Sequence, residues 1–337
     1  MRVSGTSSDS MAALALALLR LAAAISAPEN PNLNALLFYT CVTPQVGNQC
    51  EEGFTLDQGG IVNRGFSSNF TTIARGAENN ISSLFAVHDT FFENGQGLRK
   101  DWEAAWEALQ TKLEPLIQSR TVVGFFVGDE LFPGKISLQD FQTALQALQT
   151  LKSKYPWLIT WENEGGTSWV TNFKDGVPTE LDVISLDDYY MWNKTEGNTP
   201  QSMVDGHRAF YEANIYPLLK PHQRVYLVPG SYATHDPRAS VTPGYPRGNL
   251  TYCFNTSFDG CDQYMAEQAY AFAEWAFDDP RVAGIAPWHW DTRGIGVVTP
   301  FKEVGVADMP RTKAAWRAIG QRIRANADQL QIDGKRN

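Results

Sequence analysis

The chain has 337 residues, 43% of them apolar, which is enough to build the core of one large domain or of two ordinary ones. Its formal net charge is −9 at pH 7, and its sequence pI is about 5.1. No basic surface is therefore expected that could neutralise the phosphates of a nucleic acid.

The N-terminal segment, residues 1–27, is predicted to be a signal peptide. Residues 11–19 are apolar, and small residues precede position 28, as signal peptidase cleavage requires. Arg20 interrupts the apolar run and Arg2 is the single basic residue before it, so an amphipathic helix of the mature fold is the alternative. The run is too short and too interrupted to span a membrane, and no membrane span is expected elsewhere.

Glycosylation sequons and cysteines also indicate a secreted protein. Each Asn-x-Ser/Thr sequon is an acceptor for an N-linked glycan in an exposed loop. Sequons begin at Asn69, Asn80, Asn193, Asn249 and Asn255. The cysteines fall into two pairs that are close in sequence, which favours two local disulfides over the other connectivities. These pairs are Cys41 with Cys50 and Cys253 with Cys261. A metal site is the alternative, but neither pair has C-x2-C spacing.

Short apolar runs alternate with helical patterns through residues 28–337, and no linker or repeat divides this region. The alternation predicts a parallel sheet with crossover helices. Strands are predicted at residues 35–42, 81–89, 121–130, 157–164, 181–190, 224–232 and 281–290. Helices are predicted at residues 98–118, 138–154, 263–277 and 311–330.

A closed barrel needs an eighth strand, and residues 51–79 are the expected place because they are long and poorly patterned. The chain is then a single-domain (β/α)8 barrel, or TIM barrel, with long loops at the strand ends. An open, doubly wound sheet of seven strands is the alternative. The G-x-G-x-x-G turn of the dinucleotide-binding version is absent after the first strand.

Strand parity predicts which side chains face the barrel mouth. Alternate residues of a barrel strand face the interior, and active sites lie at the C-terminal strand ends. In the strand at 121–130, the residues Val123, Phe125 and Val127 form the apolar set that suits the helices. Asp129 shares that outward parity, so Glu130 is predicted to point into the mouth.

Carboxylates at several strand ends are the groups that glycoside cleavage requires. One carboxylic acid donates a proton to the glycosidic oxygen, and a second group stabilises or attacks the oxocarbenium-like centre. Glu130 ends an apolar strand, where desolvation would raise its pKa enough to hold a proton near neutral pH. Asp187 and Glu164 are the leading candidates for the second group, and Glu162 follows. Each could instead bind sugar hydroxyls or orient Glu130.

Aromatic side chains could form the sugar-binding surface, since the chain has 10 Trp, 12 Tyr and 18 Phe. Trp288 is expected to stack against a sugar at the barrel floor, with a purely structural core residue as the alternative. The other residues expected to bind substrate are Trp290, Tyr189, Tyr232, His88, Glu162 and Asn163.

Three segments resemble the TIM-barrel glycosidase superfamily. GFFVGDE looks like the fourth strand of such enzymes, which ends in the acid/base glutamate, and this resemblance implies that role for Glu130. GIAPWHWDTR is similar to the closing strand of family 18 chitinases and their relatives, in which a tryptophan lies beneath the sugar. LDDYY is similar to their sixth strand, which places an Asp and a Tyr near the substrate. The chain lacks their D-x-x-D-x-D-x-E motif, and its seventh strand, YLVPGSY, lacks the nucleophile of the glutamate-pair glycosidases.

The leading hypothesis is therefore a secreted, monomeric glycoside hydrolase that cleaves a polysaccharide or glycan. A non-catalytic carbohydrate-binding barrel is the alternative. No metal or cofactor is expected, because the five His residues show neither H-x-H nor H-E-x-x-H spacing. The chain also lacks a G-x-S-x-G elbow and a phosphate-binding loop.

Overall fold

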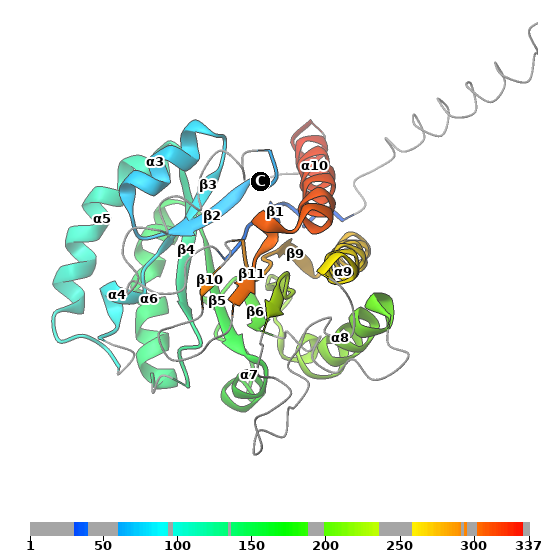
Figure 1. The fold of residues 1–337 in the computed structure, drawn as a ribbon. Coiled ribbons are helices and arrows are strands. Elements are labelled where there is room, and N and C mark those ends of the chain that lie inside the picture. The colour runs from blue at the N-terminus through cyan, green and yellow to red at the C-terminus, as the bar shows by residue number, and fades with distance from the viewer. Residues whose placement is uncertain are drawn as a thin grey trace, which may run out of the picture.

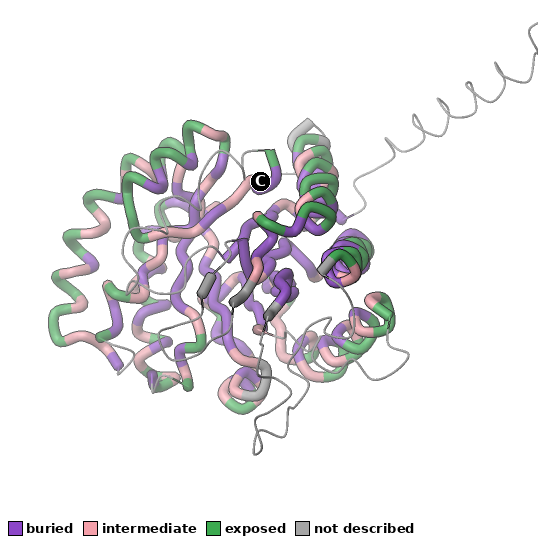
Figure 2. Tube along the Cα trace, viewed as in Figure 1, coloured by how far each residue is buried: buried purple, intermediate pink, exposed green. Residues whose placement is uncertain are grey.

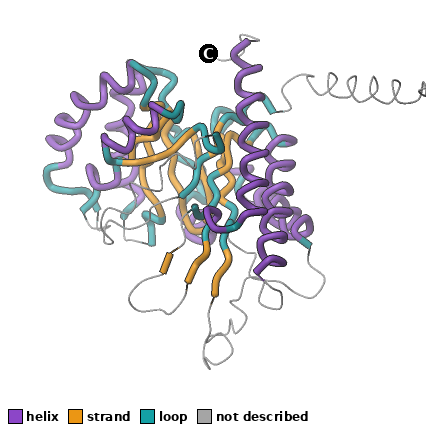
Figure 3. Tube along the Cα trace, turned by 45° about the horizontal axis from the view of Figure 1, so that its top comes forward, coloured by secondary structure: helices purple, strands orange, loops and turns teal. Residues whose placement is uncertain are grey.

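A computed structural model describes residues 30–39, 60–93, 97–133, 136–187, 199–235, 258–290, 293–294 and 302–332. Eight parallel strands form one sheet in the order β1-β9-β7-β6-β5-β4-β3-β2. The strands lie in the centre and helices flank them (Figures 1 and 3). The predicted TIM barrel is confirmed.

The barrel strands are β1 Ala35–Leu36, β2 Arg64–Ser67, β3 Ser82–Ala86, β4 Val122–Asp129, β5 Ile159–Gly165, β6 Val183–Asp187, β7 Arg224–Val228 and β9 Val282–Ile285. The helices are α3 Phe70–Glu78, α4 His88–Phe91, α5 Trp102–Gln118, α6 Leu138–Lys154, α7 Gly166–Asn172, α8 Pro200–Asn214, α9 Phe258–Asp278 and α10 Pro310–Ile332. Short 3-10 helices span Tyr216–Leu218 and Val306–Asp308. A small antiparallel sheet joins β10 Arg293–Gly294, β11 Lys302–Val304 and β8 Ala233–His235.

The eighth strand expected within residues 51–79 is β2, and Asn63 just before it closes the barrel against β1. The Asn63 backbone N–H donates to the Leu36 carbonyl at 3.2 Å. Its side-chain Oδ1 accepts from the Leu36 N–H at 2.9 Å, and its Nδ2 donates to the Asn34 carbonyl at 2.8 Å. One asparagine side chain thus takes the place of ladder hydrogen bonds between two strands.

Two apolar layers result from the alternation of side chains along the strands. The inner layer fills the barrel and includes the rings of Tyr39, Phe66, Phe126, Trp161 and Tyr226. The outer layer lies between the strands and the helices, whose far faces are exposed (Figure 2). Barrels of this kind are packed cores, so chemistry is confined to their rims.

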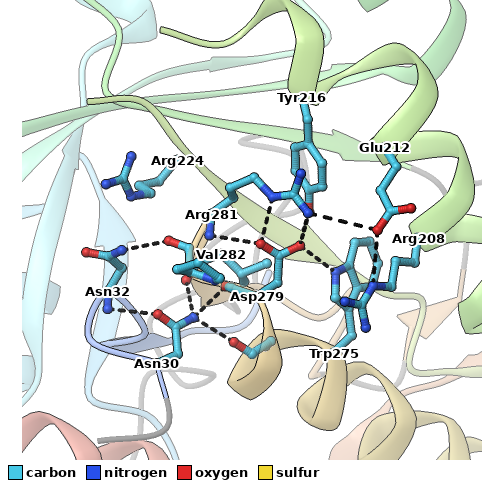
Figure 4. A network of polar contacts seen from close by, with 12 residues as sticks. Asn30, Asn32, Arg208, Glu212, Tyr216, Arg224, Trp275, Asp279, Arg281 and Val282 are labelled. Carbon is cyan, nitrogen blue, oxygen red and sulfur yellow. Dashed lines mark hydrogen bonds and ion pairs between the residues drawn. The ribbon is translucent and has the colours of Figure 1, made fainter. Parts of the chain in front are cut away.

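A buried polar network holds the end of the barrel where β9 begins (Figure 4). Asp279, which is 1% exposed, accepts from Arg281 Nε and Nη2 at 2.8 Å each and from the Tyr216 hydroxyl at 3.0 Å. The Arg281 guanidinium lies 3.5 Å from the centre of the Tyr216 ring. Asn30 Nδ2 donates to three main-chain carbonyls around the end of α9 at 2.6–2.9 Å. Polar contacts therefore anchor the chain just before β1 and β9.

Most features that predict export lie outside the described residues. They are residues 1–27 and Cys41, Cys50, Cys253, Asn193, Asn249 and Asn255. Asn69 and Asn80 are exposed, as glycan acceptors must be. Cys261 is buried and is not free, but its pairing with Cys253 stays a prediction. Within the described part of the chain, every helix is too short or too polar to cross a membrane.

Candidate active site

A β-bulge in β4 decides which carboxylate enters the barrel mouth. Phe126 pairs with Trp161 on β5, whereas Gly128 pairs with Glu162, the next residue along that strand. Val127 is therefore an extra residue without a partner. Such an insertion reverses the inward and outward alternation of all residues that follow it.

The predicted outward orientation of Asp129 is wrong because of this bulge. Asp129 pairs with Asn163, which shares the inward parity of Trp161, so Asp129 faces the barrel interior. Glu130 follows the end of β4 and is exposed, with a positive φ of 48°. A Cβ atom at Gly165 would lie 3.3 Å from Glu130 Oε1, which places this carboxylate over the end of β5 at the rim.

A directed chain of hydrogen bonds joins the floor of the mouth to two aspartates. Trp161 Nε1 donates to Ser185 Oγ at 2.7 Å, and Ser185 Oγ donates to Asn163 Oδ1 at 2.6 Å. Because an indole N–H only donates, the hydroxyl proton of Ser185 is directed to the amide oxygen. Asn163 Nδ2 then donates to Asp129 Oδ1 and to Asp187 Oδ1, at 2.7 Å each.

The bridging amide sets the spacing of the two carboxylates. The two N–H bonds of one amide diverge by about 120°, so the two bound oxygens, each 2.7 Å from Asn163 Nδ2, lie roughly 5 Å apart. The pKa of Asp129 is raised to about 6, because burial and the negative charge of Glu130 outweigh the Asn163 hydrogen bond, His88 and Tyr39, which lower it. A substantial fraction of Asp129 therefore holds a proton near neutral pH.

Glu164 supports the loops that follow β4 and β5. Its Oε2 accepts from the Phe132 N–H at 3.1 Å. Its Oε1 accepts from the Gly165 N–H at 3.1 Å and from Ser168 Oγ at 3.0 Å. Burial raises the pKa of Glu164, and these hydrogen bonds oppose the rise. Both oxygens are thus engaged by the protein itself.

Glu162 lies behind the barrel wall and does not reach the mouth. Its cross-strand neighbours are Gly128 and Ile184, and Ile184 belongs to the outer apolar layer. Glu162 is 0% exposed, and neither carboxylate oxygen has a hydrogen-bond partner within the described part of the chain. Burial raises its pKa well above the ordinary value, and the charge of Glu164 adds to the rise. Burial therefore favours the neutral, protonated form of Glu162.

Tyr39 is a residue of the mouth that the sequence analysis did not single out. It continues the inward alternation of Ala35 and Leu37, and that alternation was the available signal. Its ring lies 5.8 Å from Trp161 and 5.5 Å from Trp288. Trp288 is partly exposed at the floor of the mouth, where a stacking residue is expected. The peptide bond that follows Trp288 is cis.

Three more residues were predicted to bind substrate, and the two that the structure describes differ in how far they are exposed. His88 keeps 33% of its side chain exposed, and its Nδ1 lies 3.0 Å from Asp89 Oδ1. Tyr232 is 2% exposed and stacks on His289. Tyr189 lies outside the described residues.

The inward orientation predicted for Trp290 is wrong. The strand β9 ends at Ile285, so the alternation of a strand no longer applies at Trp290. Its ring packs edge-on against Phe38, 5.1 Å away, in the outer apolar layer. Across the described ranges, no group of three or more His, Cys, Asp or Glu residues is arranged to hold a metal ion.

Comparison with known proteins shows the fold. No family model and no curated protein sequence matches the chain. Xylanase 10B from Thermotoga petrophila RKU-1, in complex with xylobiose, matches with a TM-score of 0.51 and 13% identity over 86% of this chain and 94% of that one. The GH2 β-galacturonidase from Eisenbergiella tayi, bound to galacturonate, matches with a TM-score of 0.51 and 12% identity over 85% of this chain. The match covers about half, 51%, of that galacturonidase. The chain shares the TIM-barrel fold of these glycosidases.

Proposed function

We propose that the chain is a glycoside hydrolase whose catalytic pair is Asp129 and Asp187. The observation that carries this proposal is the amide of Asn163, which donates to one oxygen of each carboxylate at 2.7 Å. The pair lies at the C-terminal ends of β4 and β6, where barrel enzymes carry their chemistry. The pKa of Asp129, about 6, suits a group that must donate a proton.

The spacing of the pair favours a mechanism that retains the anomeric configuration. Two carboxyl groups about 5–5.5 Å apart are typical of retaining glycosidases, whereas about 6.5–9.5 Å leaves room for the water of an inverting one. Asp129 donates its proton to the glycosidic oxygen as that bond to the anomeric carbon breaks. Asp187 attacks the anomeric carbon and forms a glycosyl ester. Asp129, now ionised, takes a proton from water, which hydrolyses the ester and restores Asp187.

The aromatic surroundings support a carbohydrate substrate. Trp288 is partly exposed, and its ring lies 5.5 Å from that of Tyr39. A flat, partly exposed ring suits the apolar face of a pyranose. In this proposal Glu130 is not the proton donor. Its negative charge at the rim raises the pKa of Asp129.

The cellular setting belongs to the same proposal. The apolar segment before residue 28, the sequons and the two cysteine pairs together support secretion of a monomeric, glycosylated enzyme with local disulfides. Secretion of the full chain, with loss of residues 1–27 and a mass shift on glycosidase treatment, is the expected result. An unprocessed N-terminus would contradict it.

Trapping of the covalent intermediate tests the proposed reaction. The protein is first screened against aryl glycosides, and the best substrate is then supplied as its 2-fluoro analogue. Peptide mass spectrometry should find the fluorosugar on the peptide that contains Asp187, and NMR should show a product of retained configuration. Label on Glu164 or an inverted product would refute this assignment. A wild-type protein that binds oligosaccharides and cleaves none would instead be a carbohydrate-binding barrel.

A further inference from the structure

The hydroxyl of Tyr39 is buried next to the carboxylate pair, and none of the described residues meets it with full hydrogen-bond geometry. Tyr39 is 1% exposed, and its hydroxyl oxygen has no hydrogen-bond partner within the described ranges. Asp129 and Ser185 lie close enough to interact with it, since Tyr39 lowers the pKa of Asp129 and Ser185 lowers that of Tyr39, but neither contact has full hydrogen-bond geometry. A buried hydroxyl without a partner lowers the stability of the folded state.

The ring of Tyr39 is held so that its hydroxyl cannot turn towards solvent. Its backbone N–H donates to the Pro287 carbonyl at 3.1 Å, and its carbonyl accepts from the Trp290 N–H at 3.2 Å. Four aromatic rings surround it with centroids 5.2–6.4 Å away. They belong to Phe66, Phe126, Trp161 and Trp288.

The groups that act on the Tyr39 hydroxyl are acidic. Burial raises its pKa well above the ordinary value, and Asp129 on β4 and Asp187 on β6 raise it further, with a smaller contribution from Glu162 on β5. His88, after β3, is the basic side chain that lowers the pKa of Asp129. The hydroxyl therefore keeps its proton at every working pH, and an O–H group beside carboxylates can only serve them as a donor.

We propose that Tyr39 is a positioning residue whose preorganised hydroxyl donates to the Asp129–Asp187 pair when negative charge develops on Asp129 during glycoside cleavage. The inference rests on the proposed function. When Asp129 gives its proton to the leaving oxygen, it becomes a carboxylate, and a small shift completes the hydrogen bond from Tyr39. The proton of Tyr39 stays on its oxygen throughout. A donor that is fixed in place before the reaction needs no reorganisation in the transition state, which is the condition for strong electrostatic stabilisation.

Tyr39→Phe separates this role from a packing role. The variant should unfold at a higher temperature than the wild type, because it removes a buried hydroxyl without a partner. Its kcat and kcat/KM should both fall about 10- to 100-fold with KM nearly unchanged, as expected for a bond made only in the transition state. If Tyr39 only packs, kcat should stay unchanged, because Phe keeps the ring and removes only the hydroxyl.

Tyr226→Phe is the matched control, because Tyr226 lies deeper in the same barrel interior. Its hydroxyl accepts from Arg64 Nη1 at 2.8 Å, so the variant should lose stability and keep wild-type kcat and pH dependence. A Tyr39→Phe enzyme with wild-type kcat would overturn the inference. Asp129→Asn with wild-type kcat would overturn the proposed function instead, so the two failures are distinguishable.

Discussion

Ser185 Oγ lies 2.6 Å from Asn163 Oδ1 and thereby decides which side of the amide meets the two aspartates. Ser185 has one proton to give, and the indole of Trp161 cannot accept it. The Glu162 carbonyl lies 3.4 Å away, so the shorter contact with Asn163 Oδ1 is the stronger one. The amide nitrogen is thus turned to Asp129 and Asp187. Orientation of the proposed catalytic pair begins in the floor of the barrel.

Loss of the Ser185 hydroxyl should weaken catalysis through this amide. Ser185→Ala frees the Asn163 amide to rotate and to present its oxygen to carboxylates, so kcat should fall by about tenfold or more. Ser83→Ala is a suitable control, because Ser83 Oγ is buried on β3 without a partner among the described residues. That variant should keep wild-type kcat. Equal losses in both variants would show a general packing effect.

The pH dependence of kcat/KM should carry the signature of Asp129. The acid form of Asp129 is the active one, so activity should fall as the pH rises through about 6. Glu130→Gln removes a negative charge that raises the pKa of Asp129, so the alkaline limb should move to lower pH. A full pH profile for both proteins checks this, and a limb that stays in place or moves to higher pH would argue against the assignment.

Glu162→Gln should raise stability more as the solution becomes more alkaline. Burial raises the folded-state pKa of Glu162 well above the ordinary value of 4.5, so the folded protein holds a proton that the unfolded chain releases. Its stabilising effect is complete below the unfolded pKa and is lost as the pH rises through the folded pKa. An amide does not ionise, so the gap in melting temperature between variant and wild type should widen with pH. A constant gap would mean that Glu162 is not protonated.

Glu164→Gln provides the contrast for that measurement. The carboxylate of Glu164 accepts from Phe132 N–H, Gly165 N–H and Ser168 Oγ. An amide keeps only one accepting oxygen, so this variant should melt at a lower temperature than the wild type.

The network at Asp279 should make a large contribution to stability (Figure 4). Asp279→Ala removes the acceptor of Arg281 and Tyr216 at a site that is 1% exposed, and about 2–3 kcal/mol of unfolding free energy should be lost. Burial raises the pKa of Asp279, but the hydrogen bonds from Arg281 outweigh it and the pKa is lowered. The stability that Asp279 contributes should therefore be present above its unfolded-state pKa and be lost as the pH falls through its folded-state pKa.

A surface ion pair provides the control for the Asp279 variant. Asp259 contacts Arg311 at 3.0 Å, but its side chain is 71% exposed. Asp259→Ala should therefore change the free energy of unfolding by less than about 1 kcal/mol. Denaturant titration of both variants measures the difference, and comparable losses would contradict the importance of burial here.

The sequence predicted the fold well where the apolar residues repeat regularly over a long segment. The helix predicted at residues 138–154 has those bounds in the structure, because its apolar face repeats regularly and Ser137 caps its first turn. The strand β2 had no clear pattern, since its four residues, RGFS, hardly alternate. Its position could be inferred only from the need to close the barrel.

The site was harder to predict because it depends on strand pairing. The sequence VVGFFVGDE shows no sign that Val127 is an extra residue, since a bulge is defined by the register against β5. One inserted residue turned Asp129 inward, where the alternation predicted an outward side chain. Tyr39, by contrast, could have been found by applying the same alternation to the first strand.

The central claim is tested most directly by comparing kcat/KM of Asp129→Asn and Glu130→Gln on one aryl glycoside at the optimum pH. Asp129→Asn should lose at least about 100- to 10,000-fold, because it removes the proton donor. Glu130→Gln should stay within about tenfold of the wild type, because Glu130 is exposed at the rim and acts only through its charge. Loss of activity in Glu130→Gln with activity retained in Asp129→Asn would contradict the account.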